Sequence, residues 1–126
     1  MFDSKGHPVP RPFLDRDYLA RLEAHIGVEP TRDLIAGGIP DLADLLDRLA
    51  TTAPSETATV ARLSHEIAGA AATLGLARLA QHAAGAERAA LGGTEAVGTL
   101  RGVLDLGPES LHSLREWCGR CTPATR

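Results

Sequence analysis

Hydrophobic residues recur every three or four positions along most of the chain, which is the period of an α-helix that buries one side. Asp15 is a candidate N-cap for a first short helix, and Gly27 is placed to end it. A longer helical pattern begins at Thr31, its candidate cap, and continues to about Ala50. The first half of the chain therefore predicts one short helix followed by one long helix.

Glycine and proline are expected to interrupt two of the helical patterns. Gly37–Pro40 predicts a kink or short break, because proline inside a helix removes a hydrogen bond and costs about 3 kcal/mol. Gly107–Pro108 predicts a second break, with a closing helix after it. Between them, Ser55 is expected to cap a central helix that runs to about Leu74.

The remaining boundaries are also marked by turn residues. Gly75 provides a left-handed exit from the central helix, and Leu76–Leu91 is expected to form the next one. Gly92–Gly93 ends that helix, and Thr94 is a candidate cap for the helix that follows. No convincing strand pattern is present. Short connections between helices of similar length predict an all-α fold, an antiparallel up-and-down four-helix bundle with an additional short N-terminal helix.

The chain has the size of one domain, with 126 residues. We expect a flexible, proline-rich lead-in over residues 1–12, the helical bundle over 13–119 and a tail over 120–126. Ala and Leu supply most of the 44% hydrophobic content, and only 3% of the residues are aromatic. This composition suits closely packed helices better than sheets.

The charge balance and the N-terminus restrict the compartment and the partners. The net charge is −3 without a basic stripe, which disfavours nucleic acid and anionic membrane surfaces as partners. No apolar run reaches the length of a membrane span, and the N-terminus lacks the apolar stretch of a signal peptide. The sequence thus predicts a cytoplasmic protein.

The stretch Ser64–Gly75 sets one histidine, His65, among small and apolar residues. On a helical wheel the large apolar side chains of this helix share an arc of roughly 80°, and His65 lies nearly opposite its centre. The members of that arc are Val60, Leu63, Ile67 and Leu74. His65 is therefore predicted to project outwards. Its small neighbours are either simple helix filler or a surface for a partner, and mid-helix Gly69 favours the partner because glycine there costs about 1 kcal/mol.

The run His65-Glu66-Ile67-Ala68-Gly69, followed by Gly75, resembles the active-site helix of histidine-containing phosphotransfer (HPt) domains. That family's pattern is histidine, any residue, an aliphatic residue, lysine and glycine, with another glycine six residues later. Phe13–Asp15 resembles the start of the family's first helix. Glu87 matches a glutamate of the next helix. The resemblance covers about residues 13–114.

The resemblance implies a four-helix bundle with an exposed phosphoacceptor, here His65. The imidazole would take a phosphoryl group from the aspartate of one receiver domain and pass it to another. The chain would then be a phosphoryl carrier in a two-component phosphorelay rather than a stand-alone enzyme. It would act as a monomer, and its partners would be response regulator receiver domains and a hybrid histidine kinase. It would carry no cofactor or metal, because Mg²⁺ belongs to the receiver.

The resemblance also assigns the residues around His65. Ala68 stands where the family usually has a lysine that helps with the phosphoryl charge, and Arg62 is the nearest substitute. Gly69 would leave room for a partner's active site to close over the imidazole. The docking surface is expected to comprise Ala61, Ala68, Ala72 and His82.

Two other functions and one other motif remain open. The same surface could belong to a non-catalytic helical module that binds a receiver domain. Ser64–Ile67 also resembles the phosphoacceptor motif of histidine kinase dimerisation helices, so a degenerate dimerisation domain is a further alternative. Trp117–Cys121 resembles a thioredoxin motif but lacks the strand that such chemistry requires. Two free thiols, or an adventitious disulfide, is the preferred interpretation of Cys118 and Cys121.

Overall fold

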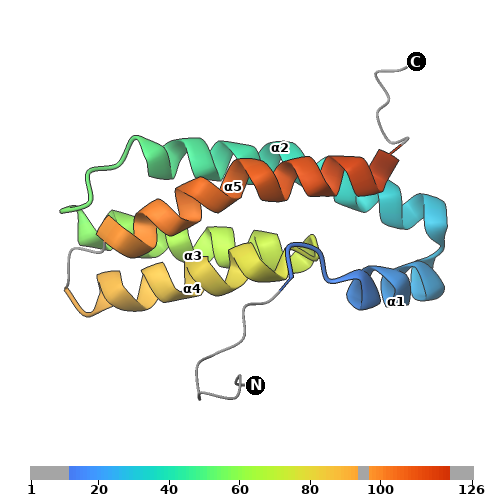
Figure 1. Cartoon of the computed structure of the whole chain (residues 1–126), viewed down its shortest axis with the longest axis horizontal. Coiled ribbons are helices and arrows are strands. Elements are labelled where there is room, and N and C mark those ends of the chain that lie inside the picture. Colours follow the sequence, from blue (N-terminus) through green and yellow to red (C-terminus); the bar gives the residue numbers. More distant parts are fainter. Residues whose placement is uncertain (1–11, 94–96, 120–126) are drawn as a thin grey trace.

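The computed structural model of the chain describes residues 12–93 and 97–119, and this part is all-helical, with five helices and no strand. Figure 1 shows the longer helices lying lengthwise beside one another, with the short N-terminal helix at one end. The elements are α1 (Arg16–Ile26), α2 (Val28–Ala50), α3 (Thr57–Thr73), α4 (Ala77–Leu91) and α5 (Val97–Cys118).

The long helices contact one another in a closed cycle. α2 packs on α3, α3 on α4, α4 on α5, and α5 on α2, while α1 contacts α2. The contact between α3 and α4 is the most extensive. Many of the residues buried in these two helices are alanines, which allow close approach of the backbones: Ala61, Ala71, Ala83, Ala86 and Ala90.

The core is built from the aliphatic stripe of every helix. The largest fully buried side chains come from all five helices and include Leu19, Ile35, Leu42, Ile67, Leu79 and Leu114. The stripe predicted for the central helix is confirmed, since Val60, Leu63, Ile67 and Leu74 are all buried. Burial of this apolar area fixes the rotation of α3, and that rotation decides which of its residues reach solvent.

Several predicted boundaries are confirmed. The Asp15 carboxylate accepts a hydrogen bond from the Tyr18 backbone N–H at 3.0 Å, so Asp15 caps α1. Gly27 separates α1 from α2 with a φ of 98°. Gly75 ends the α3 segment with a φ of 78°, and a Cβ there would lie 3.2 Å from Leu19 Cδ2. Glycine at position 75 therefore meets two demands, the left-handed backbone and the close approach of α1.

Two predicted caps are wrong, and a third lies outside the described residues. Thr31 is buried inside α2, where its hydroxyl donates to the Gly27 carbonyl oxygen at 2.7 Å instead of capping. α3 begins after Glu56 without a side-chain cap, so Ser55 does not cap it. Thr94 belongs to 94–96, which the structure does not describe. The predicted lead-in up to residue 11 and the predicted tail also lie outside the described part.

Neither predicted helix break is present, and the kink that was the alternative at Gly37–Pro40 stays a prediction. α2 runs through Pro40 and α5 runs through Pro108 without interruption. The glycines beside these prolines are points of close helix approach: a Cβ at Gly107 would lie 2.9 Å from Leu46 Cδ1, and one at Gly38 would lie 2.6 Å from Leu74 Cδ2. Burial of the surrounding apolar stripe outweighs the lost hydrogen bond, because tertiary packing overrides local propensity.

Candidate functional site

His65 projects from the outer face of α3. Its side chain is 74% exposed, whereas Leu63 and Ile67 on either side of it are buried. The exposure predicted from the helical wheel is thus confirmed. The imidazole is held outwards because the two buried aliphatic residues fix the opposite face of the helix in the core.

One ring nitrogen of His65 is held by a carboxylate from the neighbouring helix. Nδ1 lies 3.1 Å from Oε2 and 3.3 Å from Oε1 of Glu87, which belongs to α4. Because a carboxylate oxygen accepts, Nδ1 carries the proton of this hydrogen bond. In the neutral imidazole the lone pair is then on Nε2. The contact with Glu87 thus orients the exposed ring and leaves Nε2 as its one nucleophilic nitrogen.

Gly69 lies one turn beyond His65 and has open space in front of it. A Cβ built on Gly69 meets nothing within 4 Å, and the residue is exposed. Glycine in the middle of a helix costs about 1 kcal/mol relative to alanine. No described neighbour needs that space, so the packing of this chain does not explain the glycine.

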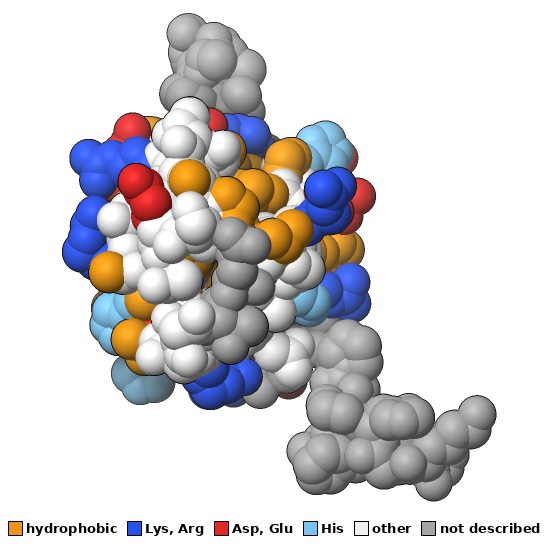
Figure 2. All heavy atoms as spheres, turned by 90° about the vertical axis from the view of Figure 1, so that its left-hand side faces the viewer, with side chains coloured by type: hydrophobic (Ala, Val, Ile, Leu, Met, Phe, Trp, Pro, Cys, Tyr) orange, Lys and Arg blue, Asp and Glu red, His pale blue; other side chains and the backbone are white. Residues whose placement is uncertain are grey.

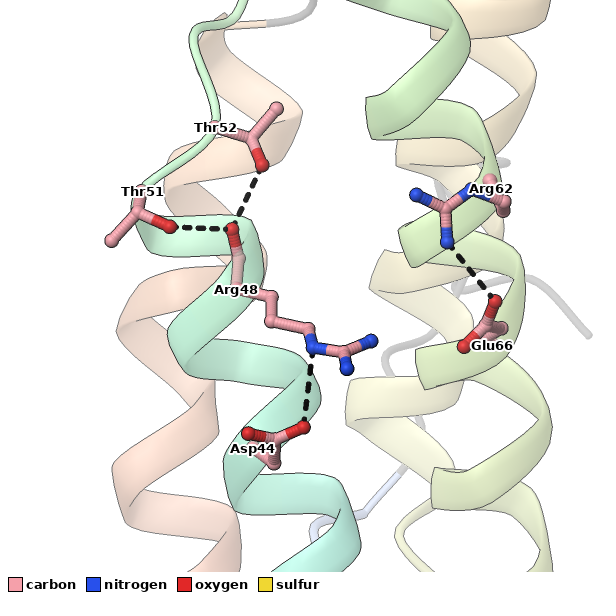
Figure 3. A network of polar contacts seen from close by, with 6 residues as sticks. All are labelled: Asp44, Arg48, Thr51, Thr52, Arg62 and Glu66. Atoms are coloured by element: carbon pink, nitrogen blue, oxygen red, sulfur yellow. Dashed lines mark hydrogen bonds and ion pairs between the residues drawn. The ribbon is translucent and has the colours of Figure 1, made fainter.

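Arg62 is directed along α3 rather than towards the imidazole. Figure 3 shows its guanidinium reaching Glu66, with Nη1 at 3.5 Å from Oε2. Both side chains are well exposed, at 60% and 43%. Exposed pairs at this spacing contribute only a few tenths of a kcal/mol, about 0.3–0.5 in helices. Arg62 is therefore an exposed cation on the same helix as His65, and it pairs with Glu66.

The predicted docking surface is only partly brought together. Ala61 is buried at 6% exposure between the closely packed α3 and α4, so its assignment to an accessible surface is wrong. Ala68 is half-buried, and Ala72 is exposed. The accessible part of this surface thus runs from His65 through Gly69 to Ala72.

His82 is exposed but faces another helix. A Cβ on Gly102 of α5 would lie 3.3 Å from His82 Cδ2. Its Nδ1 is 3.1 Å from the Arg78 carbonyl oxygen, one turn earlier in α4. The structure therefore does not place His82 beside His65, because it lies on the α5 side of α4. Glu87, and not His82, is the α4 residue whose side chain lies against His65.

Other kinds of site have little support in the described part of the chain. Residues 12–93 and 97–119 contain no group of three or more His, Cys, Asp or Glu side chains that could hold a metal ion. None of the helices in these ranges combines the length and the apolar character that crossing a membrane requires. Cys118 is buried at the end of α5, and Cys121 lies outside the described residues. The state of the two thiols, free or joined in a disulfide, thus stays a prediction.

A second exposed apolar region lies at the end of the molecule where α4 ends and α5 begins. Figure 2 views this end and shows hydrophobic side chains gathered between charged ones. Leu91 is 70% exposed and Val97 is 45% exposed. A shallow groove between the end of α2 and the start of α5 adjoins them, lined in part by Leu49, Pro54 and Leu100. Asp105 and Arg101 also line this groove, but the groove contains no histidine or cysteine.

Comparisons with protein-family models, curated proteins and solved structures found no match to this chain. The features that bear on function are therefore those of the described residues themselves. They are an exposed histidine, a carboxylate on one of its nitrogens and an unobstructed glycine one turn away.

Proposed function

We propose that this chain is a histidine phosphotransfer protein that relays a phosphoryl group between receiver-domain aspartates in a two-component phosphorelay. The observation that carries the proposal is the exposed imidazole of His65, whose Nδ1 is hydrogen-bonded to Glu87. Nε2 is then the ring nitrogen left to react with a partner. The cyclic packing of α2 to α5 supports the finer description of the fold, an antiparallel up-and-down four-helix bundle with α1 as the additional short helix.

The transfer requires one bond to form and one to break. The lone pair on His65 Nε2 attacks the phosphorus of the receiver's phosphoaspartate in line, and the aspartate carboxylate leaves with the electrons of the broken O–P bond. Nδ1 keeps its proton throughout. The phosphorylated ring therefore becomes positively charged, and the Glu87 carboxylate at 3.1 Å stabilises that charge. The reverse reaction returns the group to a second receiver.

The receiver supplies the remaining catalytic groups in this proposal. Mg²⁺ and the acidic pocket that holds the phosphoryl group belong to the partner, and this chain only presents the imidazole. Gly69 leaves room for the rim of that pocket, because nothing occupies the space in front of it. Arg62 can approach the phosphoryl oxygens once it leaves Glu66, at a cost of a few tenths of a kcal/mol, about 0.3–0.5. The cell compartment would be the cytoplasm, where such relays act on soluble regulators.

Glu87 has a predicted effect of its own. Replacing Glu87 with alanine is expected to slow transfer to His65 by about tenfold, since a charge-assisted hydrogen bond at a partly exposed site contributes on the order of 1.4 kcal/mol. The variant should also lose its phosphoryl group to water faster, because the charged ring is no longer stabilised. Rates of labelling and of label loss, measured with the same phosphorylated receiver, provide the check.

The matched control for Glu87 is Glu66→Ala. Glu66 is an exposed glutamate adjacent to His65 in sequence, and it pairs with Arg62 instead of the imidazole. Glu87→Gln tests the charge separately, since an amide oxygen still accepts from Nδ1. Equal rates for wild type and Glu87→Ala would remove Glu87 from the site, and an equal loss in Glu66→Ala would indicate a general effect of surface charge.

The two alternatives are supported less well. A kinase dimerisation hairpin needs an apolar face for a second copy, whereas α2 and α5 already cover the stripe of α3 and α4 within one chain. A non-catalytic receiver-binding module would use the same exposed face but would not need an oriented imidazole. Incubation with a phosphorylated receiver domain tests the proposal: acid-labile label on this chain supports a carrier, and stable binding without label leaves the binding module.

A further inference from the structure

A groove lies between α2 and α3, beyond the histidine along the same helix. It encloses about 470 Å³ and is lined by Asp33, Leu34, Gly37, Gly38, Asp41, Ala70, Thr73 and Leu74. We refer to these residues as the α2–α3 groove. Figure 3 shows the neighbouring stretch of the same two helices, which run antiparallel, with Asp44 and Arg48 on α2 and Arg62 and Glu66 on α3.

The floor of the α2–α3 groove is apolar and unfilled. Leu34 is 48% exposed, which is high for a large aliphatic side chain, and Leu74 lies beneath it in the core. Gly37 is exposed in the interior of α2, and a Cβ there meets nothing within 4 Å. As at Gly69, the packing of this chain leaves the helix penalty of about 1 kcal/mol unexplained. An occupant that approaches the α2 backbone closely accounts for both Leu34 and Gly37.

The rim of the groove carries unbalanced negative charge. Asp33 and Asp41 line it, both are exposed, and neither pairs with a cation in the described part of the chain. The next carboxylates along these helices are different, because Asp44 pairs with Arg48 at 3.2 Å and Glu66 pairs with Arg62. Asp33 and Asp41 thus leave negative charge uncompensated beside the apolar floor of the groove, which favours a cationic occupant.

From these features we infer that the α2–α3 groove binds an amphipathic helix of a partner protein whose apolar stripe is flanked by Lys or Arg. A helix fits because the groove follows two antiparallel helices whose own backbone groups are already hydrogen-bonded, which leaves no free edge for a strand. A second copy of this chain is disfavoured, since the chain has a net charge of −3 and would bring acidic rims together. The inference concerns binding alone and does not depend on phosphoryl transfer.

The test uses two stapled helical peptides as probes. Both carry the same leucine stripe, flanked by lysines in one and by glutamates in the other. In ¹⁵N-labelled full-length protein the lysine peptide is expected to shift the amide signals of Leu34, Gly37, Ala70 and Thr73, and the glutamate peptide is not. The Asp33→Asn/Asp41→Asn double variant should bind the lysine peptide about fivefold more weakly, as expected for two exposed charge pairs.

Asp47→Asn is the matched control, because Asp47 is an exposed aspartate of α2 that does not line the groove. It should bind the lysine peptide as wild type does. Gly37→Gln should block the lysine peptide while the helix content is retained. Equal binding of the two peptides, shifts that map elsewhere, or unchanged affinity in the double variant would overturn the inference. Groove shifts that appear on concentrating the protein without peptide would assign the groove to self-association instead.

Discussion

Replacing His65 with glutamine is expected to reduce acid-labile labelling by a phosphorylated receiver domain to background. Glutamine keeps a polar side chain of similar reach, but its amide nitrogen has no lone pair available to attack phosphorus. The fold should be retained, because the side chain is 74% exposed and its hydrogen bond to Glu87 lies at the surface of the helix pair. The measurement is transfer of labelled phosphoryl groups, with helix content followed by circular dichroism.

His82→Gln is the matched control for this variant. It removes another exposed histidine from the adjacent helix, one whose ring is directed towards α5. Transfer to this variant should equal transfer to wild type. Persistent label in His65→Gln would contradict the assignment of the phosphoacceptor, and loss of label in His82→Gln would restore His82 to the site.

Replacing Gly69 with glutamine is expected to stabilise the fold but to slow phosphoryl transfer. Gly69→Gln is expected to raise the free energy of unfolding by about 0.5–1 kcal/mol, since it replaces mid-helix glycine where space is open. The melting temperature should rise by about 2–4 °C for a chain of this size. Transfer from the receiver should nevertheless fall by at least about tenfold, because the new side chain stands where the partner's pocket closes over the imidazole.

The matched control is Gly98→Gln in the first turn of α5. Gly98 is also exposed, and a Cβ there also meets nothing within 4 Å. This variant should leave transfer unchanged. A Gly69→Gln protein that accepts phosphoryl groups at the wild-type rate would show that no partner approaches this part of α3, and Gly69 would then be helix filler.

Local periodicity was sufficient to predict much of the fold. The spacing of Val60, Leu63 and Ile67 defined the buried face of α3, and that face alone placed His65 outside. The cap at Asp15 and the left-handed turn at Gly75 were also predictable, because each is determined by the chemistry of a few adjacent residues. These predictions need no knowledge of which helices become neighbours.

The errors arise where one helix meets another. Pro40 and Pro108 did not break their helices, and close by in the same helices Gly38 and Gly107 are the points where Leu74 and Leu46 approach. Local propensity contains no information on that packing. The burial of Ala61 was missed for a similar reason: a helical wheel shows its angle but not how closely α4 approaches.

The contact between Glu87 and His65 joins two helices, and it could have been predicted from the distance of each residue from the turn between them. His65 lies ten residues before Gly75 and Glu87 twelve residues after it, so an antiparallel pair joined at this turn places them at nearly the same height. The sequence indicated the glutamate but not its partner. Applying hairpin symmetry about Gly75 would have paired the two residues, because contact between antiparallel helices depends on distance from the turn.

The most direct measurement of the central claim is the site of phosphorylation on the imidazole. The chain, labelled with ¹⁵N in its histidines, would be phosphorylated by a receiver and examined by ³¹P and ¹⁵N NMR. Since Glu87 holds the Nδ1 proton, the phosphoryl group is predicted on Nε2 of His65, with Nδ1 still protonated. A phosphoryl group on Nδ1, on another residue or on no residue of this chain would contradict the account.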